Sequence, residues 1–516
     1  MISPNRDTES TWRYHDLTKH SYWSIRTSPH YLDWSTRPSP FKIYPGIEPL
    51  PLPRSLVQTL APAREVVASA GIESVGNNEL DISRLASILF YSAGVTKHRT
   101  FPGGEIYFRA AACAGALYPT EIYVVCGDIE GLPAGVYHFN PGDFAFRRLR
   151  EGDLRATLAR ARADETGVNM APVSLIFTCI SWRSTWKYRD RAYRYHFWDN
   201  GMIAANALAL AAAHELAAEV VLGFVEPDVN KLIGIDGEQE LALSLLLLGN
   251  SDVRLAASPL IEELPEIDFD VVPISPTQVD YPSIREMHSA SSFADAGEVS
   301  EWRSARIHSD PRELEGEAFP LIPLAEANRA SDCIEEVIQR RASTRRFARK
   351  AMPLADLSWI IDGATHGIPA DFLRGETYLT DVYAIVNRVE GLPPGAYYYR
   401  RADRALELLK PGDFSDKAAY LTLEQELGGD ACVTFFFMAD LKSVLEAYGN
   451  RGYRAAQMEA GIIGGKMYLL AYDLKRGGTG LTFYDDDVTH FFSPHAADKS
   501  CMLVVSVGIP GKRPIV

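Results

Sequence analysis

Apolar runs of two kinds divide the chain into elements. Residues 199–218, DNGMIAANALALAAAHELAA, are small or apolar nearly all round, which predicts a helix buried on most of its surface. The runs LALSLLLLG (241–249) and SCMLVVSVG (500–508) predict buried strands. After Thr120 and Thr380, β-branched runs lead through a Gly/Pro turn into a second short strand, which predicts strand pairs. The pattern indicates the α+β class, with helices around a mostly antiparallel sheet.

The pattern occurs twice in one register. Residues 131–153 align with residues 391–413 at an offset of 260, with Gly, Pro, Gly and Tyr in matching places. The same offset pairs four further positions: Tyr188, Arg191, Arg194 and Gly201 with Tyr448, Arg451, Arg454 and Gly461. Several segments in one register indicate a duplication.

The length of 516 residues allows two large domains. We expect residues 56–255 to form the first domain and residues 329–516 the second. Residues 1–55 are rich in aromatic residues and proline, and we expect them to wrap the core as an N-terminal extension. Residues 256–328 carry Pro, Ser and acidic residues with little periodicity, which is typical of a connector.

Charge and composition exclude several classes of function. The chain has 52 Lys+Arg against 67 Asp+Glu, a formal charge of -15, which disfavours nucleic acid as a partner. It contains no apolar run of 18 residues and no apolar segment of a secretory signal, so we expect a cytoplasmic protein without a membrane span. Its six cysteines lack CxxC spacing and nearby paired histidines, so no metal site is predicted.

The stretch RRASTRRF concentrates positive charge in this acidic chain. Asp332 and Glu335, in capping-box spacing, predict a short helix that runs into it. Arg341, Ser343 and Arg345 in an extended turn would direct alternate side chains to one side. Guanidinium forks and a hydroxyl suit one phosphate group. The alternative is a solvated basic turn paired with acidic neighbours.

These residues resemble a known family. R-x-S-x-R-x-F, ending at Phe347, resembles the FMN-phosphate motif of the nitroreductase superfamily. In the first copy, RAAACAGALYPTEIYVV and WKYRDRAYRY resemble the flavin loop and the Lys-Tyr motif of SagB-type dehydrogenases, which oxidise peptide azolines to azoles. The resemblance implies two nitroreductase-like domains, each with an antiparallel-dominated sheet flanked by helices, fused as an intramolecular pseudo-dimer.

The resemblance also implies one FMN per chain, at the interface of the two halves. The phosphate motif occurs only in the second copy, and the flavin loop with Cys113, Ala114 and Gly115 occurs only in the first. At the loop position of the second copy stand Leu373 and Arg374. The family commonly has serine where this chain has Cys113, so backbone amides must carry more of the binding.

Further cofactor residues follow from the same resemblance. They are Gly478, Thr479 and Gly480 in KRGGTGLTF, Gln425 against the flavin pyrimidine, and Lys512, or alternatively Arg513, beside the phosphate. Glycine permits close approach of the backbone to the ring. The alternatives are a plain Gly-rich turn, a surface glutamine and a basic tail.

Lys187 and Tyr188 are the catalytic candidates. Dehydrogenation of an azoline removes a proton while hydride passes to FMN, so a desolvated lysine can act as base and a tyrosine as donor. The second copy has Ala447 in place of the lysine. The alternative is a surface lysine beside a core tyrosine. The arginines present in both copies are predicted to pair with buried acids.

Together these features predict an FMN-dependent oxidoreductase, a SagB-like dehydrogenase acting on a small-molecule or modified-peptide substrate. The electron acceptor would be dioxygen or another oxidant. One alternative is an NAD(P)H-dependent nitro or quinone reductase, since this family needs no dinucleotide fingerprint. Another is a flavin-binding scaffold without catalytic activity. A fused pseudo-dimer is compatible with a monomer.

Overall fold

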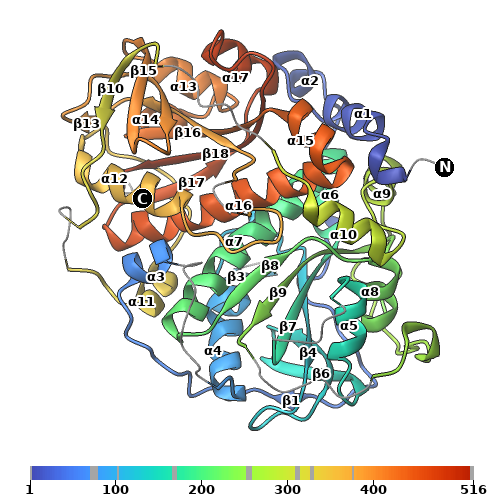
Figure 1. Cartoon of the computed structure of the whole chain (residues 1–516). Coiled ribbons are helices and arrows are strands. Elements are labelled where there is room, and N and C mark those ends of the chain that lie inside the picture. Colours follow the sequence, from blue (N-terminus) through green and yellow to red (C-terminus); the bar gives the residue numbers. More distant parts are fainter. Residues whose placement is uncertain are drawn as a thin grey trace.

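Two seven-stranded antiparallel sheets, one from each copy, form the frame of the computed structural model (Figure 1). It describes residues 3–69, 79–101, 104–164, 171–250, 258–307, 314–325, 330–374 and 377–511. The first sheet has the order β1 (Leu50–Pro51), β6 (Ala145–Glu151), β5 (Gly135–Asn140), β4 (Thr120–Cys126), β7 (Val173–Ile180), β9 (Glu240–Leu248) and β8 (Ala218–Val221). The second has the order β10 (Glu317–Pro320), β15 (Ala405–Pro411), β14 (Gly395–Arg400), β12 (Asp381–Val386), β16 (Val433–Ala439), β18 (Ser500–Gly508) and β17 (Gly477–Leu481).

The two strand orders correspond position by position, which confirms the duplicated α+β fold. The predicted strand pairs are β4–β5 and β12–β14, and each pairs in antiparallel register. The central strands β4 and β7 are buried along their whole length, because helices cover both faces of the sheet. This explains their continuous apolar runs. The edge strands β1 and β10 come from the N-terminal extension and the connector.

Helices surround both sheets. Those of the first copy are α3 (Ala63–Ser69), α4 (Ile82–Ala93), α5 (Arg155–Ala161), α6 (Trp182–Tyr188), α7 (Ala192–Ala213) and α8 (Glu226–Ile233). Those of the second are α11 (Ile334–Arg340), α12 (Leu354–Thr365), α13 (Ser415–Leu421), α14 (Glu426–Asp430), α15 (Leu441–Tyr448), α16 (Asn450–Asp473) and α17 (Asp485–Phe492). The extension carries α1 (Glu9–Leu17) and α2 (Tyr22–Arg26), and the connector carries α9 (Pro282–Ala290) and α10 (Ala296–Ser304).

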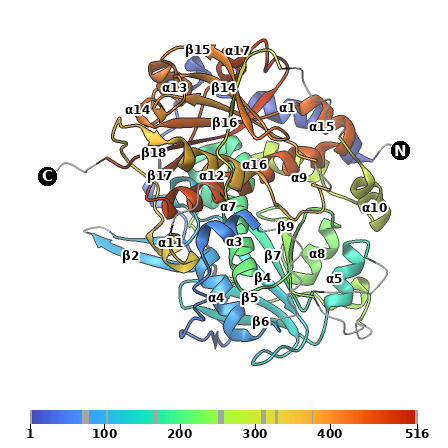
Figure 2. The same ribbon diagram turned by 60° about the vertical axis from the view of Figure 1, so that its left-hand side comes forward.

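Small elements complete the fold. Strands β2 (Val95–Phe101) and β3 (Gly104–Arg109) pair with each other, and β2 projects from the body of the molecule (Figure 2). Strands β11 (Met352–Pro353) and β13 (Val389–Glu390) form a short parallel pair. None of the described helices combines the length and the apolarity that crossing a bilayer requires.

The central helices α7 and α16 cross between the two sheets in backbone contact (Figure 1). Gly201 meets Gly461, its counterpart at the offset of 260, and a Cβ added to Gly201 would lie 2.6 Å from the Gly461 carbonyl carbon. One turn further on, a Cβ at Gly465 would lie 2.6 Å from the Ala205 Cβ. Small residues at a spacing of four therefore set the distance between the halves. The helix predicted over residues 199–218 is α7, which spans Ala192–Ala213. It ends there because Glu215 takes a left-handed φ of 57° and the chain turns into β8 at Ala218.

Buried ion pairs join the halves on both sides of this crossing. Asp485 of the second copy accepts from Arg191 (2.8 Å) and Arg194 (2.7 Å) of the first. In the reverse direction, Glu226 accepts from Arg451 and from Arg454 (2.7 Å). The predicted pairing of these arginines with buried acids is confirmed.

The extension and the connector cover these ion pairs in matching ways. Arg194 donates to the Thr18 hydroxyl just after α1 (2.8 Å), and Arg454 donates to the Ser291 hydroxyl just after α9 (2.7 Å). Both segments therefore pack on the core and complete the burial of the inter-half arginines.

The short helix before the arginine stretch exists as α11, but the predicted capping box is wrong. The helix is capped at Cys333 without a side-chain hydrogen bond. Asp332 instead pairs with Arg340 at 2.6 Å. Glu335 accepts from the amide and hydroxyl of Thr59, at 2.8 and 2.7 Å. Both acids are engaged elsewhere in the tertiary structure, which a local pattern does not reveal.

The close crossing of α7 and α16 predicts that one methyl group added at Gly201 destabilises the protein. Gly201→Ala should lower the free energy of unfolding by about 1–3 kcal/mol, because the new Cβ meets helix backbone that cannot move alone. Thermal or denaturant unfolding measures this. Gly46→Ala is the control: no atom lies within 4 Å of its added Cβ, so we expect a change within about 0.5 kcal/mol. Equal stability of the two variants would contradict the tight crossing.

Candidate functional site

A loop of the first half lies against the end of α6. Cys113 precedes a tight turn in which Gly115 and Ala116 have φ of 63° and 54°. A Cβ added to Gly115 would lie 2.8 Å from the Tyr188 hydroxyl and 3.3 Å from the Lys187 ammonium nitrogen. Glycine is therefore required both by the left-handed backbone and by the approach of these two side chains.

Lys187 and Tyr188 differ in environment. The Tyr188 ring stacks on Tyr195, with centroids 4.3 Å apart and planes 14° apart, and burial raises the pKa of Tyr188 well above its usual value. Lys187 is exposed, and partial desolvation followed by the charge of Arg345 lowers its pKa. The site thus pairs a phenol that stays protonated with an amine shifted toward its neutral form.

The arginine stretch of the second half reaches this loop. The Arg341 guanidinium donates to the carbonyls of Ala110 (2.6 Å) and Arg109 (3.1 Å), directly before the loop. Arg345 is exposed, and no acidic partner pairs with it within the described ranges. Its charge acts on both Lys187 and Tyr188. Two cations, one from each half, therefore stand near each other, and neither has an acidic partner among the residues that the structure describes.

Strand β17 presents bare backbone beside the arginine stretch. Ser343 forms a parallel bridge with Gly478, and the Gly480 amide donates to the Tyr468 hydroxyl at 2.6 Å. A Cβ added at Gly478 or Gly480 would meet its nearest atom only at 3.6 or 3.8 Å. A methyl group would therefore fit at both positions without a clash. Glycine is not required here by the packing of the protein itself. Thr479, between them, is buried.

The structure brings most of the predicted site residues together. The exception is Gln425, which stands at the N-terminus of α14 and donates to the Thr422 carbonyl at 2.8 Å, so its amide is engaged locally. Lys512 lies outside the described residues.

Two polar residues at the site were missed by the sequence analysis. Asp199 of α7 accepts from the Ala114 amide at 2.8 Å and from the Cys113 thiol at 3.1 Å. The hydroxyl of Tyr468, on α16, lies 3.4 Å from the hydroxyl of Ser343. An acid in a helix otherwise small and apolar is the signal that could have indicated Asp199.

The offset of 260 relates this site to an equivalent place on the other side of the helix crossing. That place is closed by the chain itself. Val220, the counterpart of Gly480, pairs in parallel with Ala370, the counterpart of Ala110. The Val220 amide donates to the Pro369 carbonyl (2.9 Å), and the Asp371 amide donates to the Val220 carbonyl (3.0 Å). The Val220 amide is thus bonded to another backbone segment at β8, whereas its counterpart, the Gly480 amide, donates to the side-chain hydroxyl of Tyr468 at β17.

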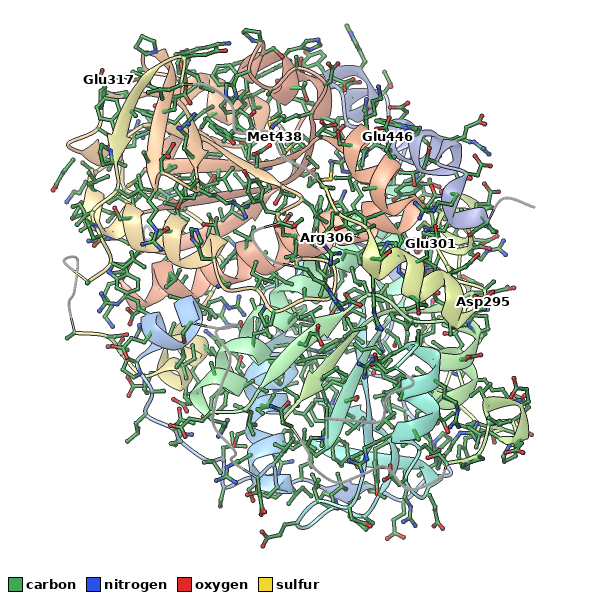
Figure 3. The ribbon with its side chains drawn as sticks, viewed as in Figure 1. Asp295, Glu301, Arg306, Glu317, Met438 and Glu446 are labelled. Carbon is green, nitrogen blue, oxygen red and sulfur yellow. The ribbon has the colours of Figure 1, made fainter. Side chains whose placement is uncertain are left out.

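Helix α10 of the connector fills the remaining space there. Trp302 is 1% exposed and packs on Tyr448, the counterpart of Tyr188, with ring centroids 5.7 Å apart. The Tyr448 hydroxyl donates to the Ala305 carbonyl at 3.3 Å. Figure 3 shows Glu301 and Arg306 on and just after this helix, close to the junction of the halves. Within the described ranges, the place beside Tyr448 is covered, whereas Lys187, Arg345 and Gly480 at the other place are exposed, and we call these the closed and the open place.

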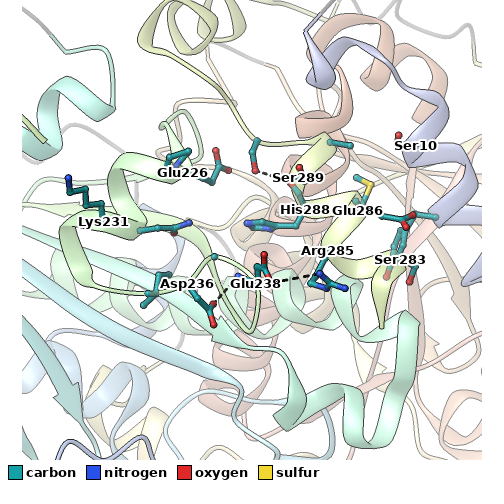
Figure 4. Close-up of a pocket in the computed structure, with 18 of the residues that line it drawn as sticks. Ser10, Glu226, Lys231, Asp236, Glu238, Ser283, Arg285, Glu286, His288 and Ser289 are labelled. Carbon is teal, nitrogen blue, oxygen red and sulfur yellow. Dashed lines mark hydrogen bonds and ion pairs between the residues drawn. The ribbon is translucent and has the colours of Figure 1, made fainter. Parts of the chain in front are cut away.

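A wide hollow of about 1010 Å³ lies elsewhere, between α1, α8 and α9 (Figure 4). Its rim carries charges of both signs, including Lys231 and Glu286, and Arg285 lies 3.8 Å from Glu238 across it. None of the predicted site residues lines it.

The chain matches the model of the nitroreductase family twice, over residues 81–249 and 338–509. Protein MJ1384 of Methanocaldococcus jannaschii, which carries a nitroreductase name, is 30% identical over 173 residues, 34% of this chain and 82% of that protein. The trifolitoxin-processing protein TfxB of Rhizobium leguminosarum bv. trifolii is 31% identical over 180 residues, 33% of this chain and 48% of TfxB. A crystal structure from Anabaena variabilis, also named a nitroreductase, matches 97% of this chain and 99% of its own, with a TM-score of 0.75 and 25% identity.

Closure by α10 predicts that Trp302 is a core residue. Trp302→Ala should lower the free energy of unfolding by about 3–5 kcal/mol, because it leaves a cavity between the connector and the second half. The matched control is Trp23→Ala, which removes a ring that is 71% exposed and should change stability by about 0.5 kcal/mol or less. A Trp302 variant as stable as the control would show that α10 does not seal this place.

Proposed function

The chain belongs to the nitroreductase family, and from the geometry of its open site we propose that it is an FMN-dependent oxidoreductase. The observation that carries the proposal is that Arg341 of the second half donates to the carbonyls of Ala110 and Arg109, directly before the loop that Lys187 and Tyr188 approach at Gly115. This brings the arginine stretch to the loop, and the charge of Arg345 acts on Lys187 and Tyr188. These residues frame one site between the halves, next to the loop at Gly115.

The residues present fit the cofactor. Arg345, with Ser343 beside it, offers donors to a phosphate, while Arg341 fixes the stretch to the loop of the first half. The backbone at Gly115 in the loop and at the exposed Gly480 of β17 offers close approach to a flat ring. The roles of Gln425 at the flavin pyrimidine and of Lys512 at the phosphate stay predictions.

We propose that the reaction is a SagB-like dehydrogenation. FMN, when bound, accepts hydride. Lys187 removes the proton, and its lowered pKa favours the neutral amine that this task requires. Tyr188 stays protonated and orients the substrate by donating its hydroxyl. Similarity to a trifolitoxin-processing protein supports a modified-peptide substrate, with dioxygen or another oxidant as acceptor.

The second candidate is NAD(P)H-dependent reduction of nitro or quinone compounds. Similarity to MJ1384, which carries a nitroreductase name, favours it. That reaction moves hydride from NAD(P)H into the site and needs no base at carbon, so Lys187 would be dispensable.

We further propose one FMN per chain. At the equivalent place, Val220 and the Pro369–Asp371 backbone are hydrogen-bonded to each other, and Trp302 covers Tyr448. A flavin there would have to break these contacts.

The flavin stoichiometry tests the cofactor assignment. Purified protein should carry one FMN per chain by absorbance, and Arg345→Ala should weaken FMN binding by about 10- to 100-fold through loss of a charge-assisted contact. Arg349→Ala removes an exposed arginine that pairs with Asp430, and it should bind like wild type. Two FMN per chain, or equal affinity in both variants, would show that the phosphate lies elsewhere.

Lys187→Met tests the direction of the reaction. With a thiazoline-containing model peptide, kcat should fall by about 10²- to 10⁴-fold while FMN stays bound, because the base is lost. In wild type, kcat should rise with pH as Lys187 deprotonates, and level off below the pH expected for an ordinary lysine, since its pKa is lowered.

Lys442→Met is the matched control, because this lysine lies on the exposed side of α15. If Lys187→Met keeps full activity with NADPH and a nitroaromatic acceptor, and wild type ignores the thiazoline peptide, the reductase assignment replaces the dehydrogenase one.

A further inference from the structure

Asp199, on α7, supports the loop of the open site that contains Gly115. It is 4% exposed on α7, and its two carboxylate oxygens accept from the Ala114 amide (2.8 Å) and the Cys113 thiol (3.1 Å). The Cys113 sulfur in turn accepts from the Tyr118 amide at 3.1 Å. The carboxylate therefore fixes the start of the turn that contains Gly115 directly, and the Cys113 sulfur connects the end of the turn to the same point.

The closed place has a carboxylate at the same position. Glu459, at the offset of 260, accepts from the Leu379 amide (2.9 Å) and the Thr380 hydroxyl (2.8 Å). Arg401 stands 3.7 Å from its other oxygen and supplies a compensating charge. Leu379 and Thr380 are the counterparts of Pro119 and Thr120, so each acid supports the segment before the central strand, at different residues. The two halves also differ in the charge around the acid.

No cation pairs with Asp199 among the residues that the structure describes. The groups that face it are the thiols of Cys113 and Cys179 and the phenol of Tyr188, all kept neutral by burial, which raises their pKa values. Arg109 lines the same small cavity under the loop, but its guanidinium donates to the carbonyls of Thr120 and Pro40.

A buried carboxylate without a counter-ion has a strong affinity for a proton. Burial raises the pKa of Asp199 to about 7. Its charge state is therefore open to change at physiological pH, and any new negative charge near the loop favours the protonated form.

We propose that Asp199 is the positioning residue of the flavin loop and takes up one proton when two electrons enter the site. This inference rests on the proposed function. In that reaction a substrate C–H bond would break as its hydrogen and electron pair leave as hydride to the bound FMN, and Lys187 would take the proton that the substrate loses and release it to solvent. The flavin then carries one added negative charge, and the Asp199 carboxylate, by accepting a proton from solvent, keeps the net charge of the site constant.

The test is the pH dependence of the flavin midpoint potential in the holoprotein, measured by reductive titration between about pH 5.5 and 8.5. Wild type should take up more protons per two electrons near neutral pH than Asp199→Asn, in which no carboxyl titrates. Glu459→Gln is the matched control and should follow wild type, because Glu459 lies at the closed place beside Arg401. Equal pH dependence of wild type and Asp199→Asn would overturn the proposal.

A second measurement covers an Asn variant that does not fold or does not hold FMN. The reduced-minus-oxidised infrared spectrum of wild type at pH 7.5, about the pH where Asp199 is largely ionised, should gain a protonated carboxyl band on reduction. Its absence would also overturn the proposal. Wild type that binds no FMN at all would instead refute the proposed function, so the two failures are distinguishable.

Discussion

The contact of α7 with α16 at Gly201 and Gly461 is the constraint on which the rest of the structure depends. Because neither residue has a side chain, the helices meet backbone to backbone, and residues on one helix fall within reach of the other half. The buried pairs of Arg194 with Asp485 and of Arg454 with Glu226 then lock the orientation from both sides. A buried arginine left without its acid is costly, so the halves are held in one arrangement.

Duplication alone would produce two equal places at this junction, and the differences between the copies make them unequal. Where the second copy has Gly480, the first has Val220, and where the first copy leaves its loop open, the second closes the backbone at Ala370. Trp302 then seals the closed place. Such specialisation is open to a fused chain, whereas a symmetric homodimer must keep both places identical.

Much of the fold could be predicted from the sequence, because it depends on local hydrophobic pattern or on repetition. The strand pairs, the buried helix and the duplication follow from periodicity and register. What could not be predicted depends on distant contacts. Glu335 was expected to cap its own helix, and it binds Thr59 instead, since a satisfied buried acid can find its donors anywhere in space. Asp199 stands in an apolar run, and only the fold shows that it supports a loop far away in the chain.

The charges of the open site divide along the same junction as the chain. The exposed Arg345 and Lys187 stand on the side reached by solvent, while the uncompensated Asp199 lies beneath the loop in a shell of neutral thiols and a phenol. The exposed cations attract an anionic group from solution. The buried acid beneath the loop can take up a proton when negative charge is added to the site. At the closed place neither condition holds, because Ala447 replaces the lysine and Arg401 stands beside the acid. The asymmetry of binding and the asymmetry of proton affinity therefore have one origin, the different loops that the two copies present to the same helix crossing.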